Sequence, residues 1–200
     1  RIGTTDRTFV EVGIGDGMEN NSAFLIAQGW RGYWLDGNDS FVPLAQRLAA
    51  QRPDSLKWHC GFVDRENIAG ILAGLGVPEE VDLMSLDIDQ NTYHVWDGLR
   101  RYRPRVMVVE YNAAIPPSVD WKVGYSPDRG WDGSQHYGAS LKAFERLGDE
   151  LGYRLVGCDF NGVNAFFVRA DLVGEHFLAP YTAENHHEPP RHLLIHHPTH

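Results

Sequence analysis

The segment with the clearest chemical potential is a glycine-rich stretch near the start of the chain, from Glu11 to Gly17. It has glycines at every second position and an acidic residue before them. Glycine lets the backbone approach a ligand closely, and free amides at a helix start attract polar or anionic groups. The segment therefore predicts a nucleotide-type binding loop in which Glu11, Gly13, Gly15 and Gly17 take part.

A second acidic residue, Asp36, ends the next short apolar stretch and is followed by Gly37. A carboxylate at this place can accept hydrogen bonds from the hydroxyls of a ribose. The alternative is an ordinary turn residue, because Asp followed by Gly is common in turns. A dinucleotide-binding fingerprint needs a further glycine where Met18 and Glu19 stand, so an NAD-type oxidoreductase is a weaker hypothesis for this loop.

Four polar residues, Asp87, Asp89, Glu110 and Asn112, lie at the ends of two later apolar stretches. The carboxyl ends of parallel strands share one edge of a sheet, so these side chains can meet over one site. Carboxylate and amide oxygens suit Mg²⁺, and Asp89, Glu110 and Asn112 are the candidate metal ligands. Two alternatives stay open. In the first, these residues bind a ligand ammonium group or substrate hydroxyls directly, and Asp87 binds the cofactor. In the second, they make only structural hydrogen bonds.

A general base is best sought among the histidines, because His titrates near neutral pH. His136 lies in an aromatic-rich segment and is the first candidate. His94 is the second, although a histidine at a helix start is often a surface or capping residue. Asp89, at a strand end, is also a candidate catalytic residue. His59 and His176 are interpreted as structural.

These residues must be positioned by the elements around them. The sequence shows a repeating order of short β-rich stretches, turns and stretches with helical periodicity, and this order is typical of a parallel sheet covered by helices. The predicted strands are Thr8 to Val12, Gly32 to Leu35, Leu56 to Cys60, Val81 to Ile88, Val106 to Tyr111, Tyr153 to Asp159 and Asn164 to Arg169. The predicted helices are Asn20 to Gln28, Ser40 to Gln51 with Ser40 as its cap, Arg65 to Leu75, Tyr93 to Tyr102 and Tyr137 to Leu151. The last two strands are close enough to form an antiparallel hairpin.

The regular order breaks after Asn112, in a segment that runs to His136 and contains several prolines, glycines and aromatic residues. Long irregular segments in compact domains are more often binding loops than spacers. We therefore expect this segment to cover the substrate that accepts the transferred group. Trp121 and Trp131 are expected to contact this substrate or the underside of the loop.

The tail beyond Phe177 is rich in Pro and His and shows no periodicity. It is predicted to be extended or partly disordered and to pack over the domain, with metal capture as the alternative. The predicted organisation is one domain at 1–177, with an insertion at 112–137, followed by the tail at 178–200.

Composition narrows the function classes. The chain has 200 residues, 42% of them hydrophobic and 22% charged, as expected for one soluble globular domain. Its 18 basic and 27 acidic residues give a net charge of -9, which disfavours nucleic acid as a partner. No apolar run approaches the roughly 18 residues of a membrane span. Cys60 and Cys158 are far apart and offer no disulfide framework or zinc site, so a cytoplasmic location is expected.

With these motifs in place, the chain from Thr8 through Arg169 resembles a class I S-adenosylmethionine-dependent methyltransferase. The glycine-rich loop resembles the first motif of that family, and Asp36 resembles its ribose-binding acid. The stretches Asp82 to Asp89 and Val109 to Asn112 look most like those of FkbM-type methyltransferases, which mostly O-methylate sugars and natural products.

The resemblance implies a Rossmann-like α/β fold, with a mostly parallel seven-stranded sheet, a C-terminal antiparallel hairpin and helices on both faces. It also implies that the loop after the third strand lies along the adenine of S-adenosylmethionine, through Phe62, Val63 and Asp64. The expected reaction is methyl transfer to a hydroxyl of a sugar-like or natural-product-like small molecule. Mg²⁺ stays open, because metal-dependent relatives resembling catechol O-methyltransferase use acids and an Asn after strands four and five.

A different class of function also stays open. Folds of this family usually carry helices before the first strand, whereas this chain begins a few residues ahead of it. Together with the long tail, this makes a non-catalytic binding module an alternative to the enzyme. Neither membrane nor nucleic acid is an expected partner, and a homo-oligomer is left open.

Overall fold

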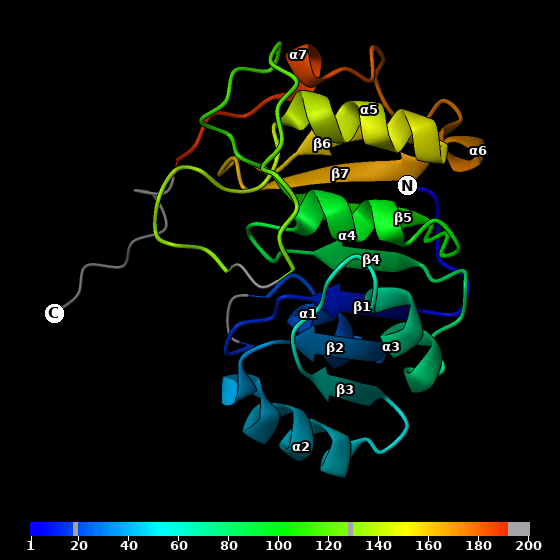
Figure 1. Ribbon diagram of the computed structural model, residues 1–200. Coiled ribbons are helices and arrows are strands. Elements are labelled where there is room, and N and C mark those ends of the chain that lie inside the picture. The colour runs from blue at the N-terminus through cyan, green and yellow to red at the C-terminus, as the bar shows by residue number, and fades with distance from the viewer. Residues whose placement is uncertain (18–19, 128–129, 192–200) are drawn as a thin grey trace, which may run out of the picture.

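The computed structural model describes residues 1–17, 20–127 and 130–191 and is built around one seven-stranded sheet (Figure 1). The strands are β1 (Thr8–Val12), β2 (Arg31–Asp36), β3 (Leu56–Cys60), β4 (Leu83–Leu86), β5 (Val106–Glu110), β6 (Tyr153–Cys158) and β7 (Asn164–Arg169). Their order across the sheet is β3-β2-β1-β4-β5-β7-β6. Strands β1 to β5 are parallel, whereas β7 is antiparallel to both β5 and β6. The predicted Rossmann-like class I methyltransferase fold is confirmed.

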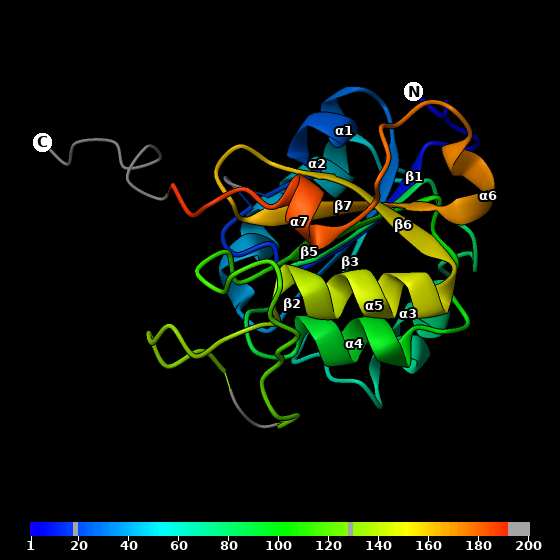
Figure 2. The ribbon, with the colours of Figure 1, turned by 90° about the horizontal axis from the view of Figure 1, so that it is seen from above.

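Helices cover both faces of this sheet (Figure 2). They are α1 (Ala23–Ala27), α2 (Val42–Gln51), α3 (Ile68–Leu75), α4 (Thr92–Gly98), α5 (Leu141–Leu151), α6 (Ala170–Val173) and α7 (Ala183–His186). In Figure 2, α1 and α2 lie on one side of the sheet, and α3, α4 and α5 lie on the other.

The core therefore has two layers, one on each face of the sheet. In β1, Val10 and Val12 pack with apolar residues of α3, α4 and α5, whereas Phe9 packs with those of α1 and α2. Successive residues of a strand point to opposite faces, so a central strand between two helical layers needs apolar residues at every position. This explains why the strands appear in the sequence as continuous apolar runs.

A polar side chain delays the start of α2 relative to the prediction. Asn38 Oδ1 accepts the N–H of Ser40 at 3.0 Å and opens a short 3-10 helix, Asp39–Phe41, ahead of α2. The hydroxyl of Ser40 donates to the carbonyl of Gly15 at 3.1 Å instead of capping α2. The prediction that Ser40 caps this helix was wrong, because short polar side chains also bond to other backbone groups nearby.

The tail packs over the domain as far as it is described. Helix α7 lies against α5, where Lys142 Nζ is 2.7 Å from both Glu145 and Glu184. His187 Nε2 is 3.1 Å from the carbonyl of Ala113, so the tail also touches the segment after β5. His192, His196, His197 and His200 lie outside the described residues. Within the described part of the chain, no helix has the length and apolar character needed to cross a membrane.

Candidate functional site

A large cleft opens at the carboxyl ends of the parallel strands. Its volume is about 1630 Å³, and its walls come from the loops after β1 to β4 and from the turn between β6 and β7. The segment 111–140, which we call the strap and which is described except at 128 and 129, contributes the remaining wall. A single drug-sized ligand needs roughly 300–1,000 Å³, so this cleft has room for a cofactor and a second small molecule.

The cleft gathers nearly all of the residues predicted to bind a cofactor. Those that line it are Glu11, Gly13, Gly15, Asp36, Gly37, Phe62, Val63, Asp64 and Asp87. Gly17 is buried beside Leu44 and is not among the residues lining the cleft.

Gly13 and Gly15 have different structural roles in the glycine-rich loop. Gly13 has a φ of +83°, and a Cβ added to it would stand 1.6 Å from the carbonyl oxygen of Asp87. This glycine therefore lets the loop pack against the end of β4. Gly15 has a φ of +56°, and a Cβ there would meet no described atom within 4 Å. Gly15 is thus the position at which the backbone faces open space in the cleft.

Asp36 organises the same loop from the end of β2. Its Oδ2 accepts the N–H groups of Ile14 at 2.7 Å and Gly15 at 2.8 Å, and its Oδ1 accepts that of Asn38 at 2.7 Å. A carboxylate has about four lone-pair sites, so one remains for a ligand hydroxyl. Besides its predicted contact with a ribose, Asp36 therefore holds the loop in place.

Glu11 is buried and holds the residues that lead into α1. It accepts the N–H groups of Asn21 at 2.6 Å and Ser22 at 3.0 Å, the amide of Asn20 at 3.0 Å and the hydroxyl of Ser22. Burial raises the pKa of Glu11, and these hydrogen bonds oppose the rise. Glu11 thus places a carboxylate directly in front of the start of α1, where a pyrophosphate would bind in a dinucleotide site.

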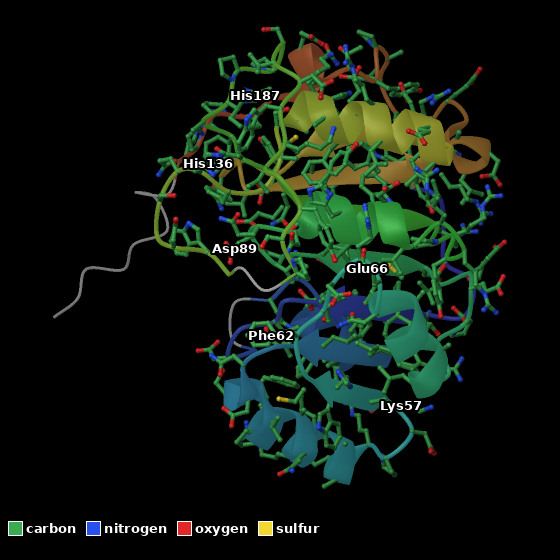
Figure 3. The ribbon with its side chains drawn as sticks, viewed as in Figure 1. Lys57, Phe62, Glu66, Asp89, His136 and His187 are labelled. Carbon is green, nitrogen blue, oxygen red and sulfur yellow. The ribbon has the colours of Figure 1, made fainter. Side chains whose placement is uncertain are left out.

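An exposed aromatic ring, that of Phe62, forms part of the cleft wall. Phe62 is 79% exposed, lines the cleft and stands beside Gly37, where an added Cβ would lie 3.0 Å from its ring (Figure 3). Asp64 accepts the N–H groups of Glu66 at 2.9 Å and Asn67 at 2.7 Å, which fixes the loop that carries Phe62. An exposed ring on a cleft wall is suited to stacking against a flat aromatic group.

Two half-buried carboxyl groups, those of Asp87 and Glu110, meet at the ends of β4 and β5. Burial raises the pKa of Asp87 to about 6, and burial together with the charges of Asp87 and Asp89 raises the pKa of Glu110 well above its usual range. Glu110 Oε2 is buried and finds no donor among the described residues. A proton on Glu110 can be donated to Asp87, and this hydrogen bond raises the pKa of Glu110 while it lowers that of Asp87.

Asp89 stands next to this pair but is not part of it. Its φ is +55°, and burial alone raises its pKa, because its carboxylate has no hydrogen-bond or ion-pair partner within the described residues. The strap lies close by: a Cβ on Gly138 would be 3.4 Å from the Asp89 carbonyl. Figure 3 shows Asp89 at the strap side of the strand ends.

The predicted metal site is not assembled. Asn112 donates to the carbonyls of Gln135 at 2.9 Å and Tyr137 at 3.2 Å, and its Oδ1 accepts the N–H of Ala114 at 3.1 Å. Its amide is therefore committed to shaping the strap. No group of three His, Cys, Asp or Glu side chains in the described ranges could hold a metal ion. The set Asp89, Glu110 and Asn112 does not fit Mg²⁺.

Neither candidate histidine is among the residues that line the cleft. The exposed ring of His136 packs edge-on against Trp121, with the ring centres 5.2 Å apart, while its carbonyl accepts Gln90 Nε2 at 3.0 Å (Figure 3). His94 is buried, and its Nε2 lies 2.8 Å from the carbonyl of Val123 in the strap. The structure thus uses both residues to position the strap.

Sequence reasoning missed the contacts that fasten the strap across the cleft. The hydroxyl of Tyr125 bonds to Glu66, and the guanidinium of Arg65 lies 4.7 Å from the centre of the Tyr125 ring. Asn91 Nδ2 donates to the carbonyl of Ser126 at 2.8 Å. These partners are far apart in the sequence and match no motif, so no sequence signal could have identified them.

No protein-family model matches the sequence, and no curated protein matches it at a significant level. Solved structures do match. The fibrillarin pre-rRNA processing protein of Methanococcus jannaschii has a TM-score of 0.53 at 14% identity, over 82% of this chain and 67% of that one. The METTL16 methyltransferase domain has a TM-score of 0.51 at 13% identity, over 84% of this chain and 60% of that one.

A S-adenosylmethionine-dependent methyltransferase from Clostridium acetobutylicum has a TM-score of 0.46 at 10% identity, over 82% of this chain and 85% of that one. At identities this low, a structural likeness shows the fold alone. The likeness to the fibrillarin and METTL16 structures agrees with the strand order, and the chain has the class I methyltransferase fold.

Proposed function

We propose that this protein is an S-adenosylmethionine-dependent methyltransferase that methylates a hydroxyl group of a sugar-like or natural-product-like small molecule. The observation that carries the proposal is that Gly15, Asp36 and Phe62 line one cleft with room for two ligands. These three residues supply an open backbone, a hydrogen-bond acceptor and an exposed ring, which are the features that suit a nucleoside.

Each of the predicted cofactor residues would contact a different part of S-adenosylmethionine. Asp36 and the loop at Gly15 would hold the ribose, and Phe62 would pack on the adenine. Asp87, with a carboxyl pKa near 6, would face the ammonium group of the amino acid part. When bound, S-adenosylmethionine supplies a methyl group on a positively charged sulfur.

The acceptor would lie between the strand ends and the strap. Asp89 has an unpartnered carboxylate there, so it can accept the hydrogen bond of an acceptor hydroxyl and take its proton as the methyl group is transferred. The strap would keep water out, and holding both ligands in line contributes most of the rate.

The geometry at Glu11 argues against the dinucleotide alternative. A pyrophosphate at the start of α1 would lie beside the buried Glu11 carboxylate, which accepts the N–H groups of Asn21 and Ser22 at 2.6 and 3.0 Å. A phosphate beside this buried carboxylate would be repelled, whereas a nucleoside linked to a positively charged sulfur would not.

A thermal-shift experiment tests the proposal. We expect S-adenosylhomocysteine to raise the melting temperature and NAD to leave it unchanged. Phe62→Ser should weaken the response, whereas Phe24→Ser should not, because Phe24 is 71% exposed but does not line the cleft. A shift with NAD alone, or equal responses of the two variants, would overturn the proposal. Transfer of a labelled methyl group to a panel of sugars would then identify the product.

A further inference from the structure

The end of the described tail is fastened to the turn between β6 and β7. The N–H of Arg191 donates to the carbonyl of Asn161 at 2.8 Å. The guanidinium of Arg191 bonds to the carbonyl of Phe160 and lies 4.2 Å from the centre of the Phe160 ring. A Cβ on Gly162 would stand 2.5 Å from the carbonyl oxygen of Pro189, so the two backbones are in contact. The tail therefore holds this turn through its backbone and through one side chain.

The same part of the tail is anchored at the end of β5. The hydroxyl of Tyr111 donates to the carbonyl of Glu188 at 2.8 Å, and the N–H of Glu188 donates to that hydroxyl at 3.3 Å. Tyr111 is only 1% exposed, so this anchor belongs to the core. The carboxylate of Glu188 lies 2.7 Å from the guanidinium of Arg191. Arg191 thus links a core anchor to the turn.

The turn that Arg191 holds is part of the cleft wall. Its residues that line the cleft are Asp159, Asn161 and Val163, together with Asn164 at the start of β7. Asp159 Oδ1 accepts the N–H of Val163 at 2.8 Å, and its Oδ2 accepts the side-chain amide of Asn164 at 3.3 Å. The orientation of Asn164 therefore depends on the shape of the turn.

Asn164 also connects the turn to the residues that lead into α1. Its Oδ1 accepts Nδ2 of Asn21 at 3.3 Å. Asn21 lines the cleft as well, and its N–H donates to Glu11, which begins the glycine-rich loop, at 2.6 Å. Asn21 and Asn164 thus form one hydrogen-bonded pair on the wall of the cleft.

This asparagine pair lies away from the residues proposed to hold the nucleoside. Asp36 and Phe62 follow β2 and β3, whereas Asn164 begins β7. Three strands separate β7 from β2, and neighbouring strands are about 4.8 Å apart, so the two strands are roughly 19 Å apart. A nucleoside at Asp36 and Phe62 would leave the amino acid part of the cofactor to extend toward Asn21 and Asn164.

We propose that Arg191 is a positioning residue for the amino acid part of S-adenosylmethionine. Arg191 fixes the turn, and the turn fixes Asn164 and Asn21 where they meet this part of the cofactor. A side-chain amide has two donors and an acceptor oxygen, which match the carboxylate and the ammonium group of an amino acid. Binding groups act best when their neighbours lock their geometry. This inference rests on the proposed function and adds a residue that supports its cofactor site.

Calorimetry with two ligands tests this inference. S-adenosylhomocysteine contains a nucleoside and an amino acid part, whereas methylthioadenosine contains the nucleoside and the sulfur without the amino acid part. Arg191→Gln removes the guanidinium that bonds to Phe160. We expect this variant to bind S-adenosylhomocysteine about fivefold more weakly, the equivalent of one ordinary hydrogen bond, and to bind methylthioadenosine as the unmodified protein does.

Two further variants locate the effect. Arg191→Lys keeps a cation beside Glu188 and should recover most of the affinity for S-adenosylhomocysteine. Arg101→Gln is the matched control, because Arg101 pairs with Glu79 at 2.6 Å and is not among the described residues that line the cleft. It should change neither affinity.

Two results would overturn the inference while leaving the proposed function intact. One is an unchanged affinity of Arg191→Gln for S-adenosylhomocysteine. The other is an equal loss for both ligands, which would show that Arg191 only stabilises the fold. If S-adenosylhomocysteine does not bind the unmodified protein, the proposed function fails and this inference fails with it.

Discussion

Replacing Glu11 by Gln tests whether one buried carboxylate holds the glycine-rich loop and α1 together. Glu11 is 1% exposed, and its two oxygens accept four hydrogen bonds, from Asn20, Asn21 and twice from Ser22. Gln has the same shape but only one acceptor oxygen. If that oxygen takes the place of Oε2, the new amide group faces the N–H of Asn21, and two donors meet.

The expected loss follows from these contacts. A hydrogen bond to a charged group contributes about 1.5–3 kcal/mol, and a buried donor left unpaired costs about 1–3 kcal/mol. Removing a buried charge offsets part of this, because burial already raises the pKa of Glu11. We therefore expect Glu11→Gln to lower the free energy of unfolding by roughly 2–4 kcal/mol.

Urea unfolding followed by circular dichroism measures this loss. The midpoint should fall while the slope of the transition stays the same. Glu175→Gln is the matched control, because Glu175 is exposed, and its effect should stay within about 0.5 kcal/mol. If Glu11→Gln lowers stability no more than this control does, the carboxylate does not hold α1 and the reasoning is refuted.

Four other substitutions test the roles of further residues. Gly13→Ala should prevent folding, because its Cβ would stand 1.6 Å from a backbone oxygen, whereas Gly15→Ala should cost only about 1–2 kcal/mol for its positive φ; equal yields of soluble protein would contradict this. Burial raises the pKa of Asp87 from 3.8 to about 6 in the folded state, so the unfolding free energy should fall as pH rises through this window. Glu110→Gln mimics the protonated acid, so the stability of this variant relative to the unmodified protein should increase with pH. A stability difference between the two proteins that does not change with pH would refute the raised carboxyl pKa values. His94→Phe should lower stability by about 1–3 kcal/mol through the unpaired strap carbonyl, and a loss of turnover without a loss of stability would restore His94 as a catalytic candidate.

The fold could be predicted because its determinants are local. The central strands β1, β4 and β5 are mostly apolar stretches between turns, and helix-period stretches separate the strands, so element type and order follow from periodicity. The terminal hairpin, which is the pair β6 and β7, was also predictable from the short connection between two β-rich stretches. Helix starts were harder, because groups such as Asn38 and Asp64 compete for the first backbone amides.

The candidate site could be predicted only where position in the fold decides it. A residue after a parallel strand must lie at the carboxyl edge of the sheet, so Asp36, Asp87 and Asp89 were found from spacing. Partners could not be predicted in this way. Nothing in the sequence shows that Asn112 bonds to the strap, or that Glu11 holds the residues that lead into α1, because these contacts depend on how distant segments meet.

The central claim, that the cleft binds S-adenosylmethionine through the glycine-rich loop, is tested most directly by calorimetry with S-adenosylhomocysteine. We predict one site per chain, and we predict that Asp36→Ala weakens binding by about 1.5–3 kcal/mol, since a charged hydrogen bond is lost and the loop loses its anchor. Asp54→Ala, at an exposed position not among the residues that line the cleft, should leave the affinity unchanged. No heat of binding with the unmodified protein, or an affinity that Asp36→Ala leaves intact, would contradict the account.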